Sequence, residues 1–132
     1  MKRLVIGLGF RNEASAQSIG EVLATVAAHS AMPGTAAVLA VPEDKAAHPG
    51  LVAAARARRL RIETVAADAM READARAATR SKRVEKYRDV GSVCEAAALA
   101  AAGAGARLVV TRMVSADRHA TAAAAIIEDP AP

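Results

Sequence analysis

The segment GLGFR at residues 7–11 follows a short apolar run and has the composition of an anion-binding turn. Gly7 and Gly9 would let the backbone turn tightly, and Arg11 would add positive charge near the free N–H groups of a following helix. A dinucleotide fingerprint needs a third glycine where Asn12 stands, and no G-x-x-x-x-G-K-[ST] phosphate loop is present. The segment therefore predicts a turn that faces an anion other than a nucleotide, or glycines that only shape the turn.

The pair Ser92-x-x-Glu95 has the spacing of a capping box at the start of an alanine-rich helix. A helix N-terminus at the carboxyl edge of an α/β sheet presents unpaired N–H groups where such folds bind ligands. Both residues are therefore candidates for ligand binding, and helix capping alone is the structural alternative. Cys94 has no base beside it in the sequence, so we expect a small buried side chain rather than a nucleophile.

The net charge of +4 and the isoelectric point of 9.8 favour anionic partners. Residues 80–88 are rich in lysine and arginine, which predicts either a solvated face or a basic rim ahead of the Ser92 helix. Arg112 and the pair Arg118-His119 flank the end of a predicted strand, where guanidinium groups would suit carboxylates. The sequence has no Ser-His-Asp order, no H-E-x-x-H motif and no Cys/His cluster with zinc spacing, so we predict no metal site and no cofactor.

Alternating strands and helices must position these residues. Strands are predicted at residues 3–8, 35–41, 60–65, 107–113 and 120–127. Helices are predicted after an N-cap at Ser15, at residues 51–59, as one or two short helices within 66–90, and from Ser92 to Gly103. This order predicts a three-layer α/β/α sandwich with a mostly parallel five-stranded sheet, whose last strand follows a tight loop and runs antiparallel to its predecessor. We expect one domain at residues 1–127 and a frayed tail at residues 128–132.

The composition excludes several classes of protein. Aromatic residues make up 2% of the chain, so almost no side chains are available to stack on nucleic-acid bases. A single cysteine excludes an internal disulfide and suits a reducing compartment. The N-terminus lacks the pattern of a signal peptide, and the longest small or apolar run, residues 96–106, is too short to span a bilayer. We therefore expect a cytoplasmic protein that binds neither nucleic acid nor membranes.

Three blocks of the sequence resemble the CobE protein of cobalamin (vitamin B12) biosynthesis and the related C-terminal domain of CbiG. They are VIGLGFRNEAS near the N-terminus, TRSKRVEKYRDVGSVCEAAALAAAGAGARLVVTR at residues 79–112, and HATAAAAI near the C-terminus. The middle block is the most specific, because it is similar to the family's T-x-S, spacer and G-S-(V/L)-x-E-A-A-A-L pattern. The chain departs from the family at Asn12 and Glu13, where a basic residue and a glycine often follow Arg11.

The resemblance implies a role in building the corrin ring, whose intermediates carry many acetate and propionate side chains. Our leading hypothesis is a carrier or accessory protein that binds a corrinoid or precorrin intermediate. One alternative is an enzyme for a precorrin-modifying step, with Glu95 or His119 as the acid or base. Another is an accessory subunit that docks on a second cobalamin-pathway enzyme through residues 80–88. The expected ligand-binding residues are Gly7, Gly9, Arg11, Thr79, Ser81, Ser92, Glu95, Arg112, His119 and Thr121.

Overall fold

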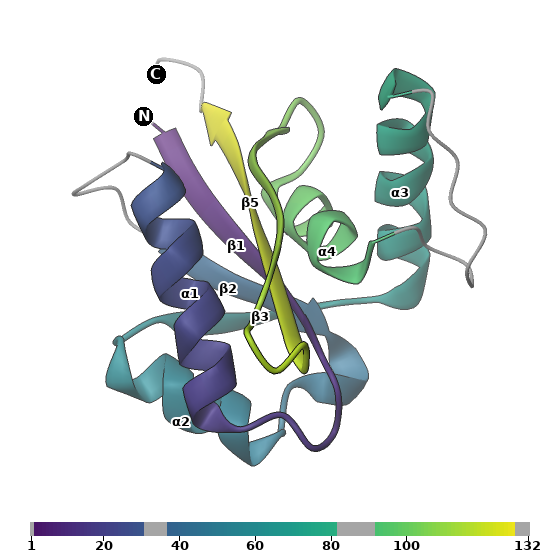
Figure 1. Cartoon of the computed structure of the whole chain (residues 1–132). Coiled ribbons are helices and arrows are strands. Elements are labelled where there is room, and N and C mark those ends of the chain that lie inside the picture. The colour runs from purple at the N-terminus through teal and green to yellow at the C-terminus, as the bar shows by residue number, and fades with distance from the viewer. Residues whose placement is uncertain (1, 31–36, 82–91, 129–132) are drawn as a thin grey trace.

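The computed structural model describes residues 2–30, 37–81 and 92–128, which form five strands and four α-helices (Figure 1). The strands are β1 (Lys2–Phe10), β2 (Ala37–Pro42), β3 (Arg61–Val65), β4 (Arg107–Val114) and β5 (Ala120–Glu128). The helices are α1 (Ala16–Ser30), α2 (Pro49–Ala57), α3 (Ala67–Ser81) and α4 (Val93–Ala102), with a short 3₁₀ turn at Glu43–Lys45. Each predicted strand is present. The region predicted to hold one or two short helices begins with the single helix α3.

The sheet has the strand order β3-β2-β1-β5-β4 and is mixed. Strand β1 pairs in parallel with β2, and β2 with β3, whereas β5 is antiparallel to both β1 and β4. The prediction of an antiparallel last strand is therefore confirmed. The prediction of a mostly parallel sheet is confirmed only in part, because β1, β2, β3 and β4 point in one direction but β5 separates β4 from the others. Strand β5 lies between β1 and β4 and not at an edge, so half of the neighbouring pairs are antiparallel.

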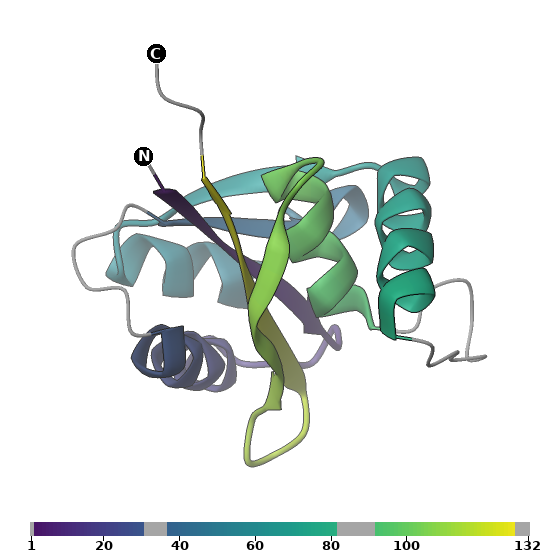
Figure 2. The same ribbon diagram turned by 90° about the horizontal axis from the view of Figure 1, so that it is seen from above.

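Helices cover both faces of the sheet (Figure 2). Alternate residues of β1 divide between two cores, with Leu4, Ile6 and Leu8 facing α1 and α2, and Val5 facing α3 and α4. The four alanines at residues 122–125 of β5 are fully buried, and their small side chains let the helical layers lie close to the sheet. Within the described part of the chain, no helix is long and apolar enough to cross a membrane.

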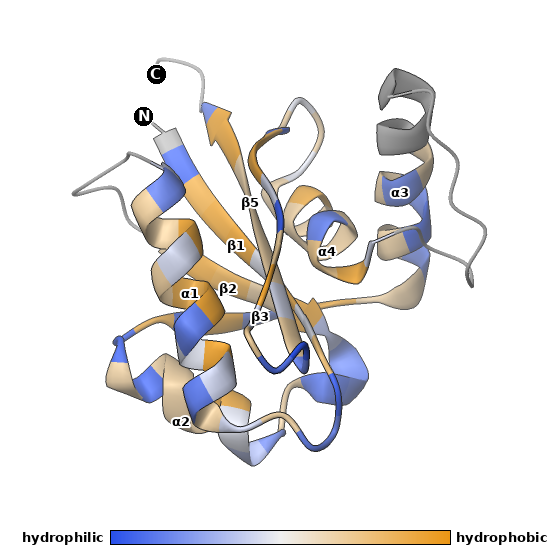
Figure 3. Ribbon diagram, viewed as in Figure 1, coloured by the Kyte–Doolittle hydropathy of each residue, from blue (hydrophilic) through white to orange (hydrophobic). Residues whose placement is uncertain are grey.

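Two helices begin at side-chain caps that lie at the carboxyl edge of β1 and β2. Ser15 accepts a hydrogen bond from the backbone N–H of Ser18 at 3.0 Å, which confirms the predicted cap of α1. The predicted apolar stripe of this helix, at residues 19, 22, 23 and 26, is buried. The cap of α2 is His48, whose Nδ1 accepts hydrogen bonds from the N–H groups of Gly50 at 3.1 Å and Leu51 at 3.4 Å. Polar residues gather in these carboxyl-edge loops, whereas the strands are largely apolar (Figure 3).

Candidate ligand-binding site

The carboxyl end of β1, the start of β5, the end of β4 and the N-terminus of α4 meet at one edge of the sheet. Gly9 of β1 pairs with Thr121 of β5, and Val114 of β4 pairs with Thr121 from the other side. A Cβ built on Gly9 would lie 3.3 Å from the Val93 side chain, so α4 starts beside the same point. The chain leaves β1 toward α1 on one face, while α4 packs on the other face. Open α/β sheets bind ligands at such a point, where the segments beside the carboxyl end of a strand lie on opposite faces of the sheet.

Gly7 and Gly9 lie inside strand β1, so the prediction of a glycine turn at these residues is wrong. The β1–β5 ladder continues through Phe10, and the turn begins only at Arg11, whose carbonyl accepts a hydrogen bond from Ala14 at 3.0 Å. The alternative interpretation, in which the glycines only shape that turn, is wrong for the same reason. Gly7 has a different role, in packing. A Cβ at Gly7 would lie 2.0 Å from the carbonyl oxygen of Cys94, so its absence allows α4 to pack directly on β1.

Ser92 caps α4, as its spacing predicts. Its Oγ accepts a hydrogen bond from the backbone N–H of Glu95 at 3.4 Å. The Glu95 carboxylate, in turn, accepts a hydrogen bond from the backbone N–H of Arg112 in β4 at 2.9 Å. This contact joins α4 to the edge strand and gives the Glu95 carboxylate a positioning role. Cys94 is buried, 3.5 Å from the Ser92 hydroxyl, and burial raises the pKa of its thiol, an effect that hydrogen bonds from Ser92 and Thr121 oppose.

Two hydrogen bonds join the end of β1 and its following turn to the hairpin loop and the start of β5. The N–H of Arg11 donates to the carbonyl of His119 at 2.9 Å, and the Thr121 hydroxyl donates to the carbonyl of Gly9 at 3.2 Å. The His119 ring is half-buried, with Nδ1 3.6 Å from the carboxylate of Asp117. The predicted residues Arg11, His119 and Thr121 are therefore close neighbours, although they come from opposite ends of the chain.

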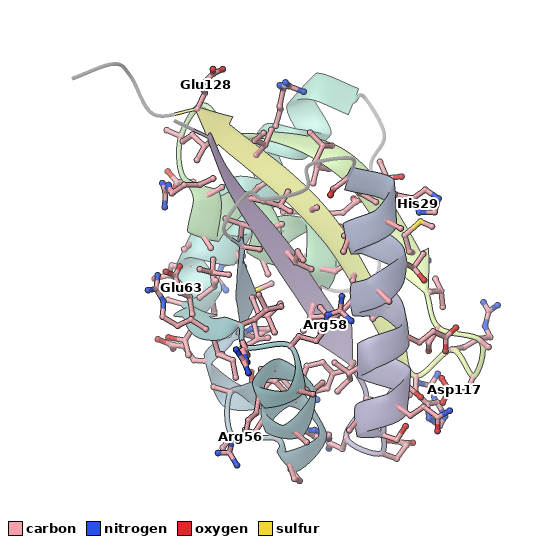
Figure 4. The ribbon with its side chains drawn as sticks, turned by 90° about the vertical axis from the view of Figure 1, so that its left-hand side faces the viewer. His29, Arg56, Arg58, Glu63, Asp117 and Glu128 are labelled. Carbon is pink, nitrogen blue, oxygen red and sulfur yellow. The ribbon has the colours of Figure 1, made fainter. Side chains whose placement is uncertain are left out.

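Asp117 organises the hairpin loop and is absent from the predicted site residues. Its carboxylate accepts hydrogen bonds from the Ser115 hydroxyl at 2.6 Å, the backbone N–H of His119 at 3.0 Å and the hydroxyl of Ser18 in α1. These donors, Ser115 foremost, hold the pKa of the Asp117 carboxyl well below its usual range. Figure 4 shows Asp117 beside α1. The Ser-x-Asp spacing in a tight loop, typical of side-chain-capped turns, is the sequence signal that points to it.

Thr79 and Ser81 lie apart from the other predicted residues. Both belong to the last turn of α3, which starts at the carboxyl edge after β3 and extends toward the opposite edge of the sheet (Figure 1). Their side chains, and residues 82–91 with most of the predicted basic rim, lie outside the described residues. Their ligand-binding role and the docking role of residues 80–88 stay predictions.

Three exposed arginines lie at this edge. The Arg11, Arg112 and Arg118 side chains are exposed, and none of them forms an ion pair with another residue in the described ranges. The carboxylates of Glu95 and Asp117 are engaged by hydroxyl and backbone N–H donors. Among the described residues, no group of three or more His, Cys, Asp or Glu side chains is arranged to hold a metal ion. The arrangement can therefore bind an anionic group through arginines and free N–H groups.

Comparison with protein families matches residues 4–125 to the model described as "Cobalamin synthesis G C-terminus". The chain belongs to the CbiG C-terminal family of cobalamin biosynthesis proteins. The resemblance to CobE and CbiG in the sequence is thus confirmed. Comparison with curated proteins found no match.

Two solved structures are similar to this chain. The crystal structure of cobalamin biosynthesis protein chiG from Agrobacterium tumefaciens str. C58 is 38% identical, with a TM-score of 0.72, and the match covers 96% of this chain and 99% of that chain. The crystal structure of CobE, from the cobalamin (vitamin B12) biosynthetic pathway, has a TM-score of 0.76 at 24% identity, and the match covers 98% of this chain and 94% of that chain. The CobE match shows that the two proteins share a fold.

Proposed function

We propose that this CbiG C-terminal family protein binds a corrin or precorrin intermediate at the carboxyl edge of its sheet and holds it for transfer to the next step. The observation that carries the proposal is the pair Arg11 and Arg112, which are exposed and lack ion-pair partners among the described residues. Corrin-ring intermediates carry several carboxylates, which are ionised at neutral pH. Guanidinium groups bind carboxylates with two parallel hydrogen bonds, so these arginines suit such a ligand.

Three features of the site support a binding role. The N-terminus of α4 adds backbone N–H groups and the positive end of a helix dipole beside Gly9 and Thr121. The Glu95 carboxylate accepts a hydrogen bond from the Arg112 backbone, which fixes the start of α4 against β4. The turn and the hairpin are already joined through the backbone hydrogen bond from Arg11 to His119, so less ordering is needed on binding.

A second candidate function, catalysis of a precorrin-modifying step, has one observation in its favour. The His119 imidazole is half-buried and lies beside the Asp117 carboxylate, which is the usual arrangement for orienting a histidine that transfers protons. The other predicted acid or base, Glu95, already accepts a hydrogen bond from the protein backbone. We therefore assign the catalytic alternative to His119 alone, and its test is a change in the mass or ring absorption of the ligand.

The test is a visible-absorbance and calorimetric titration with hydrogenobyrinic acid, a cobalt-free corrin acid, at low and moderate salt. We expect salt-sensitive binding with no change in ligand mass, and a loss of about tenfold in affinity for Arg11→Ala and for Arg112→Ala. Arg56→Ala is the matched control, because it removes the same charge from the exposed last turn of α2. Equal affinities for all four proteins would refute the assignment of the site. A changed ligand mass that depends on His119 would favour the enzyme.

A further inference from the structure

The hairpin loop between β4 and β5 holds an arginine in a backbone conformation that arginine disfavours. Arg118 has a φ of 65°, in the left-handed region, where the Cβ of an L-residue lies too close to the following carbonyl oxygen. Glycine or asparagine would occupy this position with less strain. Arg59 also has a left-handed φ, so the conformation by itself assigns no role to Arg118.

The surrounding contacts fix the loop in this conformation. The N–H of Arg118 donates to the carbonyl of Ser115 at 2.9 Å, and the Ser115 hydroxyl accepts from the N–H of Ala120 at 3.1 Å. The Asp117 carboxylate joins the loop to Ser18 of α1, a residue that is 5% exposed.

A second contact to α1 runs through Glu21, whose carboxylate accepts from the N–H of Ala116 at 3.0 Å. The loop is thus held by hydrogen bonds within itself and by two contacts to α1. Its conformation is set before any ligand arrives.

The same loop lies directly beside the candidate site. His119, the residue after Arg118, accepts the backbone hydrogen bond from Arg11, and Thr121 of β5 pairs with Gly9 of β1. Because Asp117 is engaged by hydroxyls and a backbone N–H, its negative charge is stabilised without an arginine partner. The exposed Arg118 guanidinium forms no ion pair within the described part of the chain.

We propose that the β4–β5 hairpin is a preformed arm for anion recognition, in which Ser18, Ser115 and Asp117 hold the backbone so that Arg118 contacts a ligand carboxylate. This inference rests on the proposed binding of a corrinoid at the carboxyl edge and adds a third arginine to Arg11 and Arg112. The conformational strain is retained because the fixed loop presents the guanidinium without a further loss of loop freedom on binding.

The test compares Arg118→Gly with Arg59→Gly. Both arginines are exposed and have a left-handed φ, of 65° and 58°, but Arg59 follows α2 at the opposite, amino edge of the sheet. Each substitution removes one charge and relieves the same kind of strain. We expect each to raise Tm by about 3 °C. We expect only Arg118→Gly to weaken hydrogenobyrinic acid binding, by about tenfold at low salt. Arg118→Lys, which keeps the charge, should recover part of the affinity.

The outcomes separate this inference from the function on which it rests. If the unmodified protein binds and Arg118→Gly binds equally well, the arm is refuted and corrinoid binding stands. If Arg118→Gly lowers Tm while Arg59→Gly raises it, the arm is also refuted, because the Arg118 side chain would then stabilise the loop. If the unmodified protein does not bind hydrogenobyrinic acid, both proposals fail together. A higher Tm with weaker binding is the combination that a merely structural residue would not give.

Discussion

The close approach of α4 to β1 at Gly7 predicts a large loss of stability for Gly7→Ala. The new Cβ would lie 2.0 Å from the carbonyl oxygen of Cys94 and 2.6 Å from the backbone nitrogen of Ala98. Both are backbone atoms, so no side-chain rotation relieves the overlap. Since real carbon–oxygen contacts are rarely shorter than about 3.0 Å, α4 must move away from the sheet by roughly 1 Å.

The cost follows from what α4 buries. Six of its residues are buried, among them Ala97 and Ala98, and a gap of about 1 Å forfeits a quarter to a half of the dispersion energy of the atoms that line it. Overpacking of a core typically costs 1–3 kcal/mol, and rigid backbone neighbours place this site at the upper end. We expect Gly7→Ala to lower the free energy of unfolding by about 3 kcal/mol or more, which corresponds to a fall in Tm of about 10 °C.

Two other glycines provide matched controls for the same substitution. At Gly9 the nearest atoms belong to the side chains of Thr121 and Val93, at 3.0 and 3.3 Å, and these can shift, so we expect a loss of about 1 kcal/mol. At Gly20 in α1 nothing lies within 4 Å, and alanine should stabilise the helix by about 0.5–1 kcal/mol.

Urea unfolding followed by far-ultraviolet circular dichroism is the appropriate assay, because the chain has no tryptophan. The order of stability should be Gly20→Ala, unmodified protein, Gly9→Ala, Gly7→Ala. A Gly7→Ala variant within 0.5 kcal/mol (on the order of experimental error) of the unmodified protein would contradict the packing of α4 on β1.

The remaining predictions concern pH. The pKa of Asp117 lies below its usual range, so its contribution to stability is complete above about pH 4 and is lost as the pH falls through the lower folded pKa. Asp117→Asn should therefore flatten the acid limb of the curve of unfolding free energy against pH, and an unchanged limb would contradict the hydrogen bonds to Asp117. The pKa of Cys94 is raised from the model-compound value of 9.0, so stability should be complete at neutral pH and fall as the pH rises past that value, because the thiol of the unfolded chain ionises first. A disulfide reagent should modify Cys94 at pH 8 only after denaturation, and rapid modification of the folded protein would show that the thiol is accessible.

Local patterns in the sequence were sufficient to predict most of the elements. The N-caps at Ser15 and Ser92 depend on a hydroxyl and on N–H groups within three residues, so they are visible in a short window. The burial of Cys94 was predicted because no base stands beside it in the sequence, and the structure confirms it. The antiparallel direction of β5 followed from the short loop before it.

Contacts between distant residues decided what the sequence patterns left open. The sequence pattern around Gly7 predicts a turn. The true reason for the glycine is the backbone of Cys94, which leaves no room for a side chain and lies far away in the chain. The His48 cap was missed because histidine is not among the common capping residues. The bond from Ser18 to Asp117 joins the first helix to the last hairpin, and no local signal links them.

The sequence by itself determined the elements, the direction of the last strand, the family and the basic character of the chain, because these depend on neighbouring residues or on totals. Only the tertiary structure decided that β5 lies between β1 and β4, that the glycines serve packing, and that Arg11 meets His119. The order of the strands and the distance between a helix and the sheet depend on contacts between residues that are far apart in the sequence. The proposed anion-binding edge exists because the carboxyl end of β1 and the start of β5 are brought together there.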